Sequence, residues 1–455
     1  MEYLRPAYKQ INDTVHGYIP LTRMATEIID TEEFKRLENL FQLGTCVYVF
    51  RGATHTRFEH SIGTYYLADR LCHCILTRTP YMKLDEWLKD IPELREYYKR
   101  SGKSDHLFDE YVIELVKISA LCHDLGHGPL SHVFDDVFLS HLPLNHPMRH
   151  HEARSCAIFE KIISNHPILS EIICPDERDF VKSLIKPPEE RSGFIYQIIS
   201  NNLNGIDVDK CDYLSRDSRI LRPQGSGDFQ RLVDDVFVID NIICYPKQAH
   251  LNVVDLFSLR YYLHKQMYCH KTVLAVEYMI TDAMRLVDHL LHLTESILDL
   301  DFFCKLDEKF IINSIKFMAL YNNNPPKEIV DSYELIRRIN TRRLYRLIGS
   351  KINEDNYDID FNRLLDGTVA TKEDIVVHCC KIGYVSGDKN PLDNVYYYDR
   401  KDVSLNETPR RFSIEDHHQI TLLPAAYQEH IMMVFYRSDN EEILKMLRIN
   451  FQHMA

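Results

Sequence analysis

One twelve-residue segment constrains this chain more than any other: Leu-Cys-His-Asp-Leu-Gly-His-Gly-Pro-Leu-Ser-His at residues 121–132. The apolar spacing of residues 111–125 predicts a mostly buried helix that leads into it. Gly126, with the glycine and proline that follow, predicts where this helix ends or bends. His123 and Asp124 are therefore expected in the last turn of a helix, where the chain opens toward a cleft. So many histidines and glycines together are difficult to explain as core packing.

Two other segments carry residues of the same kinds. His60 begins a second helical pattern over residues 61–76, and Asp209 lies in a third over residues 198–214, which Gly205 is expected to interrupt. Side chains that reach inward from several helices are a common way to build a metal site in a helical bundle. The sequence therefore predicts a site assembled from segments that lie far apart in the chain.

We assign four metal ligands to this site: His60, His123, Asp124 and Asp209. Two imidazoles and two carboxylates form a mixed donor set, which suits Fe, Mn, Ni or Zn better than Mg. A divalent metal held here would polarise a phosphoryl group and lower the pKa of a bound water. On chemistry alone the fourth ligand stays open, because three further carboxylates lie nearby: Asp207, Asp212 and Asp217.

Histidines beside the expected metal site are candidates for proton transfer or for contacts with phosphate, because imidazole titrates near neutrality. They are His127, His132 and His151. His127 follows His123 by four residues, so both side chains share one side if the helix continues. Asp135 is a candidate to orient one of these histidines through its second ring nitrogen.

A second cluster follows later in the chain. Arg260, His264 and Tyr268 have the spacing i, i+4 and i+8, so they form one stripe on a helix. Such a stripe suits a polyphosphate joined to a sugar or base, since a guanidinium can bind phosphate oxygens through two hydrogen bonds. Lys210 and Tyr213, close to the fourth metal ligand, form a second candidate phosphate grip. Taken alone, the stripe would equally describe a solvated helix face.

The composition narrows the choice of partners. The chain has 455 residues, 45% of them hydrophobic, and a net charge of −13. An acidic surface repels DNA at long range, so no extensive nucleic-acid surface is expected. Twelve cysteines without paired spacing indicate free thiols in a reducing compartment. Because we find neither an apolar leader nor a membrane-spanning stretch, we expect an intracellular protein, cytoplasmic or nuclear.

The pattern of apolar residues predicts a mainly α protein, with a helical core at residues 1–325 and a smaller α+β lobe at residues 326–455. The boundary follows the Asn-Asn-Asn-Pro-Pro break at 322–326. Runs rich in β-branched and aromatic residues predict strands in the lobe, and its end mixes a strand with a final helix. The predicted strands are residues 375–384, 394–398 and 432–436.

Short motifs spread from Ile11 to the last helix occur together in one known family. They are Asn12-Asp13-x-x-His16-Gly17, Gln42-Leu43-Gly44, Val49-Phe50-x-Gly52-Ala53-x-His55, Arg57-Phe58-Glu59-His60-Ser61, the 121–132 segment, Asn204–Asp209, Asp212-Tyr213, Arg216-Asp217, Tyr278–Ala283 and Lys389-Asn390-Pro391. Together they resemble the sterile-alpha-motif-and-HD-domain deoxynucleoside triphosphate triphosphohydrolases. The resemblance implies an HD-domain helical bundle, and we expect no counterpart of the sterile alpha motif.

The resemblance also implies an activity, the hydrolysis of a dNTP to the deoxynucleoside and inorganic triphosphate. The four ligands would hold the metal, and the implied catalytic group is His127, His151 and Asp135, with His151 the general acid to the leaving 5′-oxygen. The implied triphosphate contacts are Arg57, His132, Lys210, Tyr213 and Arg260. Gln42 and Asp217 would bind the 3′-hydroxyl. Leu43 and Tyr268 would crowd the 2′ position and so select deoxyribose.

Family members are activated by guanine and deoxynucleotides bound between subunits, and this chain departs from the family at those positions. Asp30 is kept, but the positions that follow read Lys35 and Glu38, and Asp235 replaces an aromatic residue. Two further departures, in place of basic contacts near the C-terminus, are Ser413 and Asp416. Acidic groups there repel triphosphates. We therefore expect an intact core that nucleotides do not switch in the family's way, in a homodimer or, with less support, a homotetramer.

Two other functions stay open. One is an HD phosphohydrolase that acts on a phosphomonoester or a cyclic nucleotide, and the other is a catalytically idle nucleotide-binding protein. Four of the expected triphosphate contacts favour the dNTP over the first alternative: Arg57, Lys210, Tyr213 and Arg260. A lost ligand or acid would favour the second, and every matched position is present.

Overall fold

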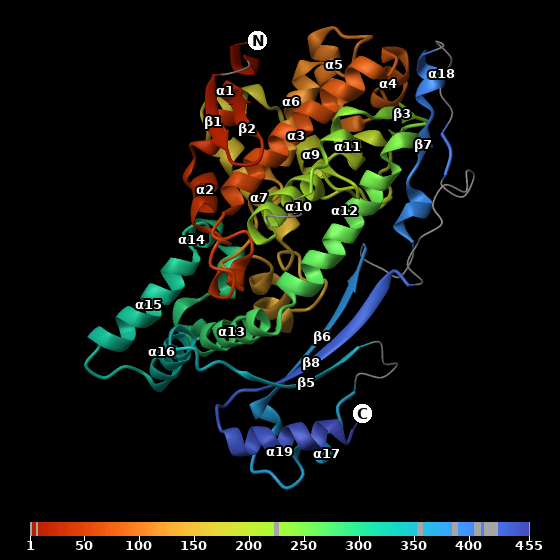
Figure 1. Cartoon of the computed structure of the whole chain (residues 1–455). Helices are drawn as coiled ribbons and strands as arrows, with labels where there is room; N and C mark the ends of the chain where they lie inside the picture. The colour runs from red at the N-terminus through yellow and green to blue at the C-terminus, as the bar shows by residue number, and fades with distance from the viewer. Residues whose placement is uncertain are drawn as a thin grey trace.

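The computed structural model describes residues 2–5, 8–222, 227–352, 358–384, 390–404, 411–413 and 426–454. A helical body makes up most of the protein, and a three-stranded sheet with two helices beneath it lies at one end (Figure 1). The prediction of a mainly α protein with a smaller C-terminal α+β part is confirmed. Lys389, which belongs to one of the quoted motifs, and Asp416, one of the changed activator positions, lie outside the described residues.

Helices make up most of the first half of the chain. They are α1 (Arg23–Ile29), α2 (Glu32–Lys35), α3 (Arg57–Arg78), α4 (Tyr81–Leu88), α5 (Arg95–Ser101), α6 (Glu110–Cys122), α7 (His151–Asn165), α8 (Leu169–Ile172) and α9 (Pro175–Ile185). The later helices are α10 (Val208–Leu221), α11 (Gln230–Asp234), α12 (His250–Leu263), α13 (Lys271–Leu291), α14 (Leu300–Phe303), α15 (Glu308–Tyr321), α16 (Lys327–Asn340), α17 (Phe361–Leu365), α18 (Arg400–Ser404) and α19 (Glu441–Gln452). Two π-helical turns, Val133–Phe138 and His264–Tyr268, lie beside the site, and such turns are frequent at functional sites.

The strands form three small sheets. An antiparallel hairpin joins β1 (Lys9–Asp13) to β2 (Gly17–Leu21). A second sheet has the order β3 (Phe237–Ile239), β4 (Ile242–Pro246) and β7 (Tyr397–Tyr398), with β4 and β7 parallel. The third has the order β5 (Arg346–Ile352), β8 (Gln428–Tyr436) and β6 (Ile375–Gly383), all antiparallel.

The third sheet is buried on both faces, because successive side chains of a strand point to opposite sides. On β8, Val434 packs with Leu447 of α19 in a small separate core, whereas its neighbour Phe435 joins the main core of the helical body. Val376 of β6 also joins the main core. The sheet is therefore attached to the body, so β6 can present side chains to the same interior space as the helices.

The predicted elements differ in how well they match the structure. The strand predicted at 375–384 is confirmed as β6, and the one at 432–436 lies within β8, but at 394–398 only Tyr397 and Tyr398 pair as a strand. The helix predicted over 198–214 is wrong in its first half. Asp207 caps the helix by accepting a hydrogen bond from the N–H of Lys210, so α10 begins only at Val208. The boundary predicted at 325/326 stays a prediction, and α16 beyond it packs on α13.

Candidate active site

A cavity of about 1320 Å³ lies where α3, α10, α12, α13, β6 and the segment after α6 approach one another. Every residue predicted for the site lines it, except His60 and Asp135. Those two are buried directly behind the wall, where His60 contacts Asp209 and Asp135 contacts His151. Sequence segments more than a hundred residues apart therefore meet around one space.

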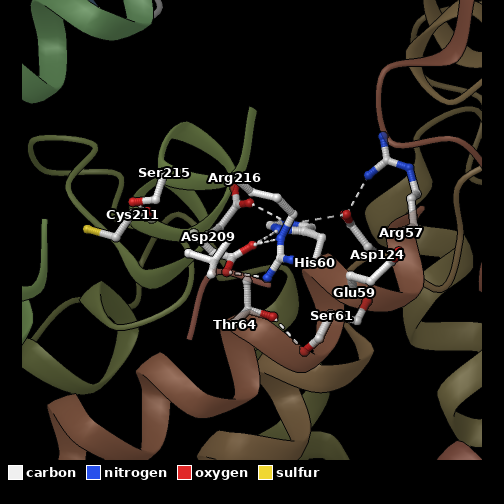
Figure 2. A network of polar contacts seen from close by, with 12 residues as sticks. Arg57, Glu59, His60, Ser61, Thr64, Asp124, Asp209, Cys211, Ser215 and Arg216 are labelled. Carbon is white, nitrogen blue, oxygen red and sulfur yellow. Dashed lines mark hydrogen bonds and ion pairs between the residues drawn. The ribbon is translucent and has the colours of Figure 1, made fainter. Parts of the chain in front are cut away.

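The four predicted metal ligands converge at the end of this cavity. His60 Nε2 lies 3.0 Å from Asp209 Oδ1 and 3.5 Å from Asp124 Oδ2. His123 Nε2 lies 3.4 Å from Asp124 Oδ1 and 3.6 Å from Asp209 Oδ1. Figure 2 shows His60 between Asp209 on one side and Asp124 on the other. Two imidazoles and two carboxylates thus face a common centre.

The donor set fits a metal ion, because both ligand histidines turn an unpaired nitrogen toward this centre. Nδ1 of His60 bonds Asp212 at 2.7 Å, and Nδ1 of His123 bonds the carbonyl of Ala120 at 2.7 Å. These bonds favour the proton on Nδ1 and leave a lone pair on Nε2. Both Nε2 atoms are buried without a hydrogen-bond partner, and a divalent cation would satisfy both.

The charges of the cluster lead to the same conclusion. Burial disfavours a charged His60, but the neighbouring carboxylates of Asp209 and Asp212 outweigh it and raise the pKa of this histidine to about 10. The pKa of His123 is also raised against its burial, chiefly by Asp124. The carboxylates therefore create an excess of negative potential at the centre. When no metal is bound, protons on the histidines neutralise part of this potential, and metal binding displaces them.

Sequence spacing could not choose among four carboxylates, and the structure distinguishes them: Asp207, Asp209, Asp212 and Asp217. Of the four, Asp209 alone reaches both ligand histidines. Asp207 accepts a hydrogen bond from the backbone of its own helix, Asp212 lies behind His60, and Asp217 bonds a histidine of the N-terminal segment. The direction of each side chain on α10 thus decides its role.

Asp212 is the centre of a supporting network to which the sequence analysis gave no role. It bonds His16 Nε2 at 2.7 Å and Arg216 Nε at 3.0 Å, and Arg216 also donates to Asp13 at 2.8 Å. Gly63 of α3 makes this approach possible, since a Cβ there would lie 2.0 Å from Asp212 Oδ1. The three polar partners occur in the motifs quoted above. Those motifs specify residue types but not the direction in which a side chain points.

Arg57, expected to contact triphosphate, is also part of the metal cluster. In the first turn of α3 its guanidinium bonds Asp124 through Nη1 and Ser131 through Nε, the latter at 2.8 Å. Leu130 and Ser131 have φ values of 67° and 58°, which are strained for residues other than glycine. The Leu130 N–H donates to the buried Glu308 at 2.9 Å. Glu308 was not foreseen, and it holds the strained turn that carries Ser131 to Arg57.

A second histidine cluster lies beside the first. The rings of His127 and His151 stack with centroids 3.8 Å apart, and His132 meets both rings edge-on. Nδ1 of His151 bonds Asp135 at 3.1 Å, and Asp135 also bonds the buried Arg154. The Nε2 atom of His151 has no hydrogen-bond partner among the described residues and is available to a ligand.

The two stacked histidines differ in charge. Burial lowers the pKa of His127 well below its usual range, and Arg57 adds to this effect. Burial also disfavours a charged His151, but its hydrogen bond to Asp135 outweighs this and raises its pKa. Gly126 keeps the start of α7 close, since a Cβ there would lie 2.0 Å from the His151 carbonyl oxygen. His151 therefore keeps its proton to higher pH than an ordinary histidine, while its neighbour stays neutral.

Cationic and hydroxyl groups form the adjoining wall. Lys210 and Tyr213 come from α10, and Arg260 and His264 come from the end of α12 and the π-helical turn after it. Arg260 is anchored by donating to the Gly383 carbonyl at 2.5 Å. Burial and Arg260 lower the pKa of His264 to about 3, so this histidine acts as a neutral group. The predicted stripe exists and faces the cavity.

Gln42, Leu43, Asp217 and Tyr268 form the next part of the wall. The Oε1 atom of Gln42 is buried without a hydrogen-bond partner. Tyr268 donates its hydroxyl to Asp217 at 2.6 Å, and its ring and Leu43 pack against the same small apolar cluster. Polar and apolar side chains thus share this part of the wall, which is an arrangement able to hold a sugar.

Comparison with known proteins identifies the fold. The HD domain model matches residues 57–217. The chain is 39% identical over 434 residues to an HD domain-containing protein of Acanthamoeba polyphaga mimivirus, covering 91% of this chain and 89% of that protein. It is 33% identical over 445 residues to the deoxynucleoside triphosphate triphosphohydrolase SAMHD1 homolog of Dictyostelium discoideum (95% and 78% covered) and 31% identical over 495 residues to SAMHD1 of Homo sapiens (97% and 72% covered). This chain belongs to the SAMHD1-related HD-domain family.

In this HD-domain phosphohydrolase related to SAMHD1, the four predicted metal ligands lie within the matched region, which begins at Arg57 and ends at Asp217. The HD domain and the clustered histidines and aspartates indicate a divalent metal site. Within the described ranges, no helix combines the length and apolar character required to cross a bilayer.

Proposed function

We propose that this phosphohydrolase cleaves deoxynucleoside triphosphates to the deoxynucleoside and inorganic triphosphate. The observation that carries the proposal is the sharing of one cavity by a cation-seeking cluster, a proton-carrying His151 and the cationic wall of Lys210 and Arg260. Such a cavity suits a polyphosphate whose cleaved bond lies beside the acid. The relatives named as deoxynucleoside triphosphate triphosphohydrolases support the same substrate.

In the proposed reaction, Lys210, Arg260 and the hydroxyl of Tyr213 bind the triphosphate and bring its α-phosphorus to the metal cluster. Water adds to this phosphorus while the bond to the 5′-oxygen breaks. His151 gives its Nε2 proton to that oxygen, and the proton lost by the water returns the imidazole to its charged form. Asp135 keeps His151 oriented and stabilises its charge.

When a divalent metal is bound, it polarises the phosphoryl oxygen and lowers the pKa of the attacking water. His60, His123, Asp124 and Asp209 would hold it, and the two imidazoles favour Fe, Mn or Zn over Mg. Asp212 fixes the His60 ring from behind.

On the nucleoside side, the unpaired Oε1 of Gln42 and the carboxylate of Asp217 are the proposed partners of the 3′-hydroxyl. The ring of Tyr268, held by its hydrogen bond to Asp217 and by its packing against the same apolar cluster as Leu43, closes the space next to the 2′ carbon. A ribonucleotide would place an additional hydroxyl there, without a partner or in collision with the ring.

Two alternatives are less well supported. A phosphomonoester or cyclic nucleotide would leave most of the cationic wall unused, since it carries far less charge than a triphosphate. A catalytically idle binding protein would not require His151 to be tied to Asp135 with its other nitrogen free. Both features favour the triphosphohydrolase.

The activity is proposed to run without family-type activation by GTP or dNTPs. Asp30 is paired with Lys9 at 3.4 Å and with Lys35 at 3.5 Å. Asp235 is buried and ion-paired with Arg78 and Arg400. Both carboxylates thus have internal partners, which leaves neither of them free to bind an activator.

We propose a homodimer. The changed activator positions that argue against nucleotide activation also argue against a tetramer. Exposed apolar side chains support an interface along α15, where Phe317 is 64% and Tyr321 is 76% exposed. The net charge of −13 argues against nucleic acid as a main partner.

Product analysis tests the proposed function. The purified protein is incubated with Mn²⁺ or Mg²⁺ and each dNTP, with and without GTP, and the products are separated by ion-exchange chromatography. Deoxynucleoside plus inorganic triphosphate without GTP is the expected result. Turnover only with GTP would remove the regulatory part of the proposal, and no turnover under any condition would remove all of it.

A further inference from the structure

The cavity continues beyond the side chains that suit a sugar. Cys269 follows Tyr268 in the chain, and the wall then runs through Glu277 of α13 to His378 and Cys380 of β6. A volume of about 1320 Å³ also exceeds the 300–1,000 Å³ that is usual for a ligand pocket. This far wall is not used by the mechanism above.

A nucleotide bound as proposed would direct its base toward the far wall. The phosphates lie at the metal cluster and the cationic wall, and Tyr268 marks the sugar. The sugar end connects to the far wall through α13, because Tyr268 packs against the small apolar cluster that contains Val273, and Glu277 follows Val273 by four residues on the same face of that helix. The other extension of the cavity, at residues 199–205, lies at the phosphate end, since Asp207 accepts hydrogen bonds from the backbone N–H groups of both Asn201 and Lys210.

Glu277 is half-buried in the cavity wall, and His378 carries one buried nitrogen there. Among the described residues, no group hydrogen-bonds the Glu277 carboxyl, and burial raises its pKa to about 7. Nδ1 of His378 bonds the Tyr278 hydroxyl at 3.0 Å, and its Nε2 is buried with no hydrogen-bond partner. Unpaired polar groups of this kind indicate a missing ligand, because leaving them unpaired costs free energy.

The two groups present a definite pattern of donors and acceptors. When the Tyr278 hydroxyl donates to Nδ1 of His378, the neutral imidazole carries its proton on Nε2 and offers one donor. The Glu277 carboxylate offers two acceptor oxygens. His378 and Glu277 are near neighbours, since His378 bonds the hydroxyl of Tyr278, the residue after Glu277, and both side chains line the cavity.

We propose that Glu277 and His378 form a guanine-recognising subsite, so that dGTP is the preferred substrate. This inference rests on the proposed function. The edge of guanine presents O6 as an acceptor and then the N1–H and N2–H groups as donors. The His378 Nε2–H would donate to O6, and the two Glu277 oxygens would accept from N1–H and N2–H. Ionisation of Glu277 strengthens both of these bonds.

The other bases fit this pattern less well. Adenine places its amino group against the His378 donor and the N1 lone pair against the Glu277 carboxylate. Thymine satisfies the donor and one oxygen, but its O2 faces the second oxygen. Cytosine places a donor against the His378 donor and an acceptor against each of the two Glu277 oxygens. A wrong partner in such a site leaves buried groups unpaired, which discriminates strongly.

The test is a competition among equimolar dATP, dCTP, dGTP and dTTP, with the four deoxynucleosides quantified over time. The wild-type protein should use dGTP with a kcat/KM about tenfold or more above that for dATP. Glu277→Gln should remove this preference, because the amide replaces one of the two acceptor oxygens with a donor that opposes guanine. His378→Phe should lower kcat/KM for dGTP more than for dATP.

Two controls separate this effect from general damage. Glu295→Gln makes the same chemical change at an exposed residue that does not line the cavity, and it should keep the wild-type ratio. Melting temperatures of all variants show whether they fold. The stabilisation of each protein by dGTP and by dATP is also measured in EDTA, so that base recognition is scored without turnover.

The outcomes distinguish the subsite from the proposed function. Equal use of the four dNTPs by the wild type, or an unchanged ratio in Glu277→Gln, would overturn the guanine subsite and leave the triphosphohydrolase standing. If no dNTP is cleaved, but dGTP stabilises the wild type more than dATP and Glu277→Gln abolishes that difference, the subsite stands and the proposed reaction fails. If neither turnover nor selective stabilisation occurs, both fail.

Discussion

The two histidine clusters of the cavity are neighbours, yet their environments are opposite. His60 and His123 face two carboxylates, which raise the pKa of both rings against the effect of burial. Burial lowers the pKa of His127 well below the usual range, and the nearby Arg57 adds to this effect. Each cluster contains three groups close enough to hold a metal. Geometry alone therefore does not tell a metal site from a proton-transfer site.

The difference lies in the charges that surround the rings. In the first cluster the carboxylates Asp124 and Asp209 have the histidines and one arginine as their partners, so negative potential remains for a cation. In the second cluster the buried carboxylate, Asp135, is already paired with Arg154, and the two more exposed carboxylates Asp136 and Glu152 lie 3.8 Å from His132 and 3.7 Å from His151. The buried part of this cluster therefore offers a second cation no uncompensated carboxylate. The first cluster is thus suited to hold a metal and the second to carry a proton.

Removal of a metal ligand should have the largest effect. His123→Ala leaves three donors around an excess of negative charge, so we expect the protein to lose its metal and its turnover to fall to the uncatalysed background. Metal content by elemental analysis and dNTP turnover measure the two effects. The matched control is His289→Ala, an exposed histidine of α13 that does not line the cavity. Retained metal and turnover in His123→Ala would reverse the assignment of the two clusters.

Removal of the proton carrier should leave the metal in place. His151→Ala should lower kcat by about 10²–10⁴-fold at unchanged metal content, the range expected for a general acid. His150→Ala, at the exposed neighbouring residue, is the control.

The pH profile sharpens this assignment. Because Asp135 raises the pKa of His151, wild-type activity should persist to higher pH and fall as pH rises through that raised value. Asp135→Asn should move this loss of activity to lower pH. A profile that does not move would mean that another group supplies the proton.

A smaller effect is expected behind the metal cluster. Asp212→Asn keeps the size of the side chain but weakens its hydrogen bond to His60, so metal affinity should fall by about 10–100-fold. Titration with Mn²⁺ measures the affinity, and added metal should restore turnover. Failure of excess metal to restore it, at an unchanged melting temperature, would show that Asp212 does more than position the ligand.

The sequence predicts the composition of this site better than its internal geometry. The order of His60, His123, Asp124 and Asp209 carries the metal prediction, because few other roles require those residue types together. Spacing alone could not choose Asp209 over Asp212, since that choice depends on how α10 is rotated against α3. The start of α10 was also misplaced, because a local hydrogen bond to Asp207 outweighs the apolar pattern before it.

Other parts of the site have no local signal at all. Glu277 and His378 lie about a hundred residues apart and meet only because β6 packs against the helical body. Glu308 begins α15, where it would ordinarily be interpreted as an exposed first-turn acid that favours a helix start. Its burial against Leu130 depends on tertiary packing, which no window of sequence contains.

Glu308 provides the smallest test, because it acts on the turn that joins the two clusters. Burial raises its pKa from 4.5 to about 7. Its contribution to stability is therefore fully present below pH 4.5 and is lost as pH rises toward 7, by roughly 3 kcal/mol in total. Glu308→Gln keeps an oxygen for the Leu130 N–H but cannot ionise.

Relative to this variant, the wild type should lose free energy of unfolding between pH 4.5 and 7, as measured by urea denaturation. Turnover at pH 7 should stay nearly unchanged in Glu308→Gln, since the turn that carries Ser131 to Arg57 remains held. Glu308→Ala, which leaves the Leu130 N–H without its partner, should lower turnover as well as stability. Equal pH dependence in the wild type and Glu308→Gln would show that the carboxyl is already ionised in the folded protein. The strained turn would then be held by a charged group, and the loss of its charge in Glu308→Gln should weaken both clusters together.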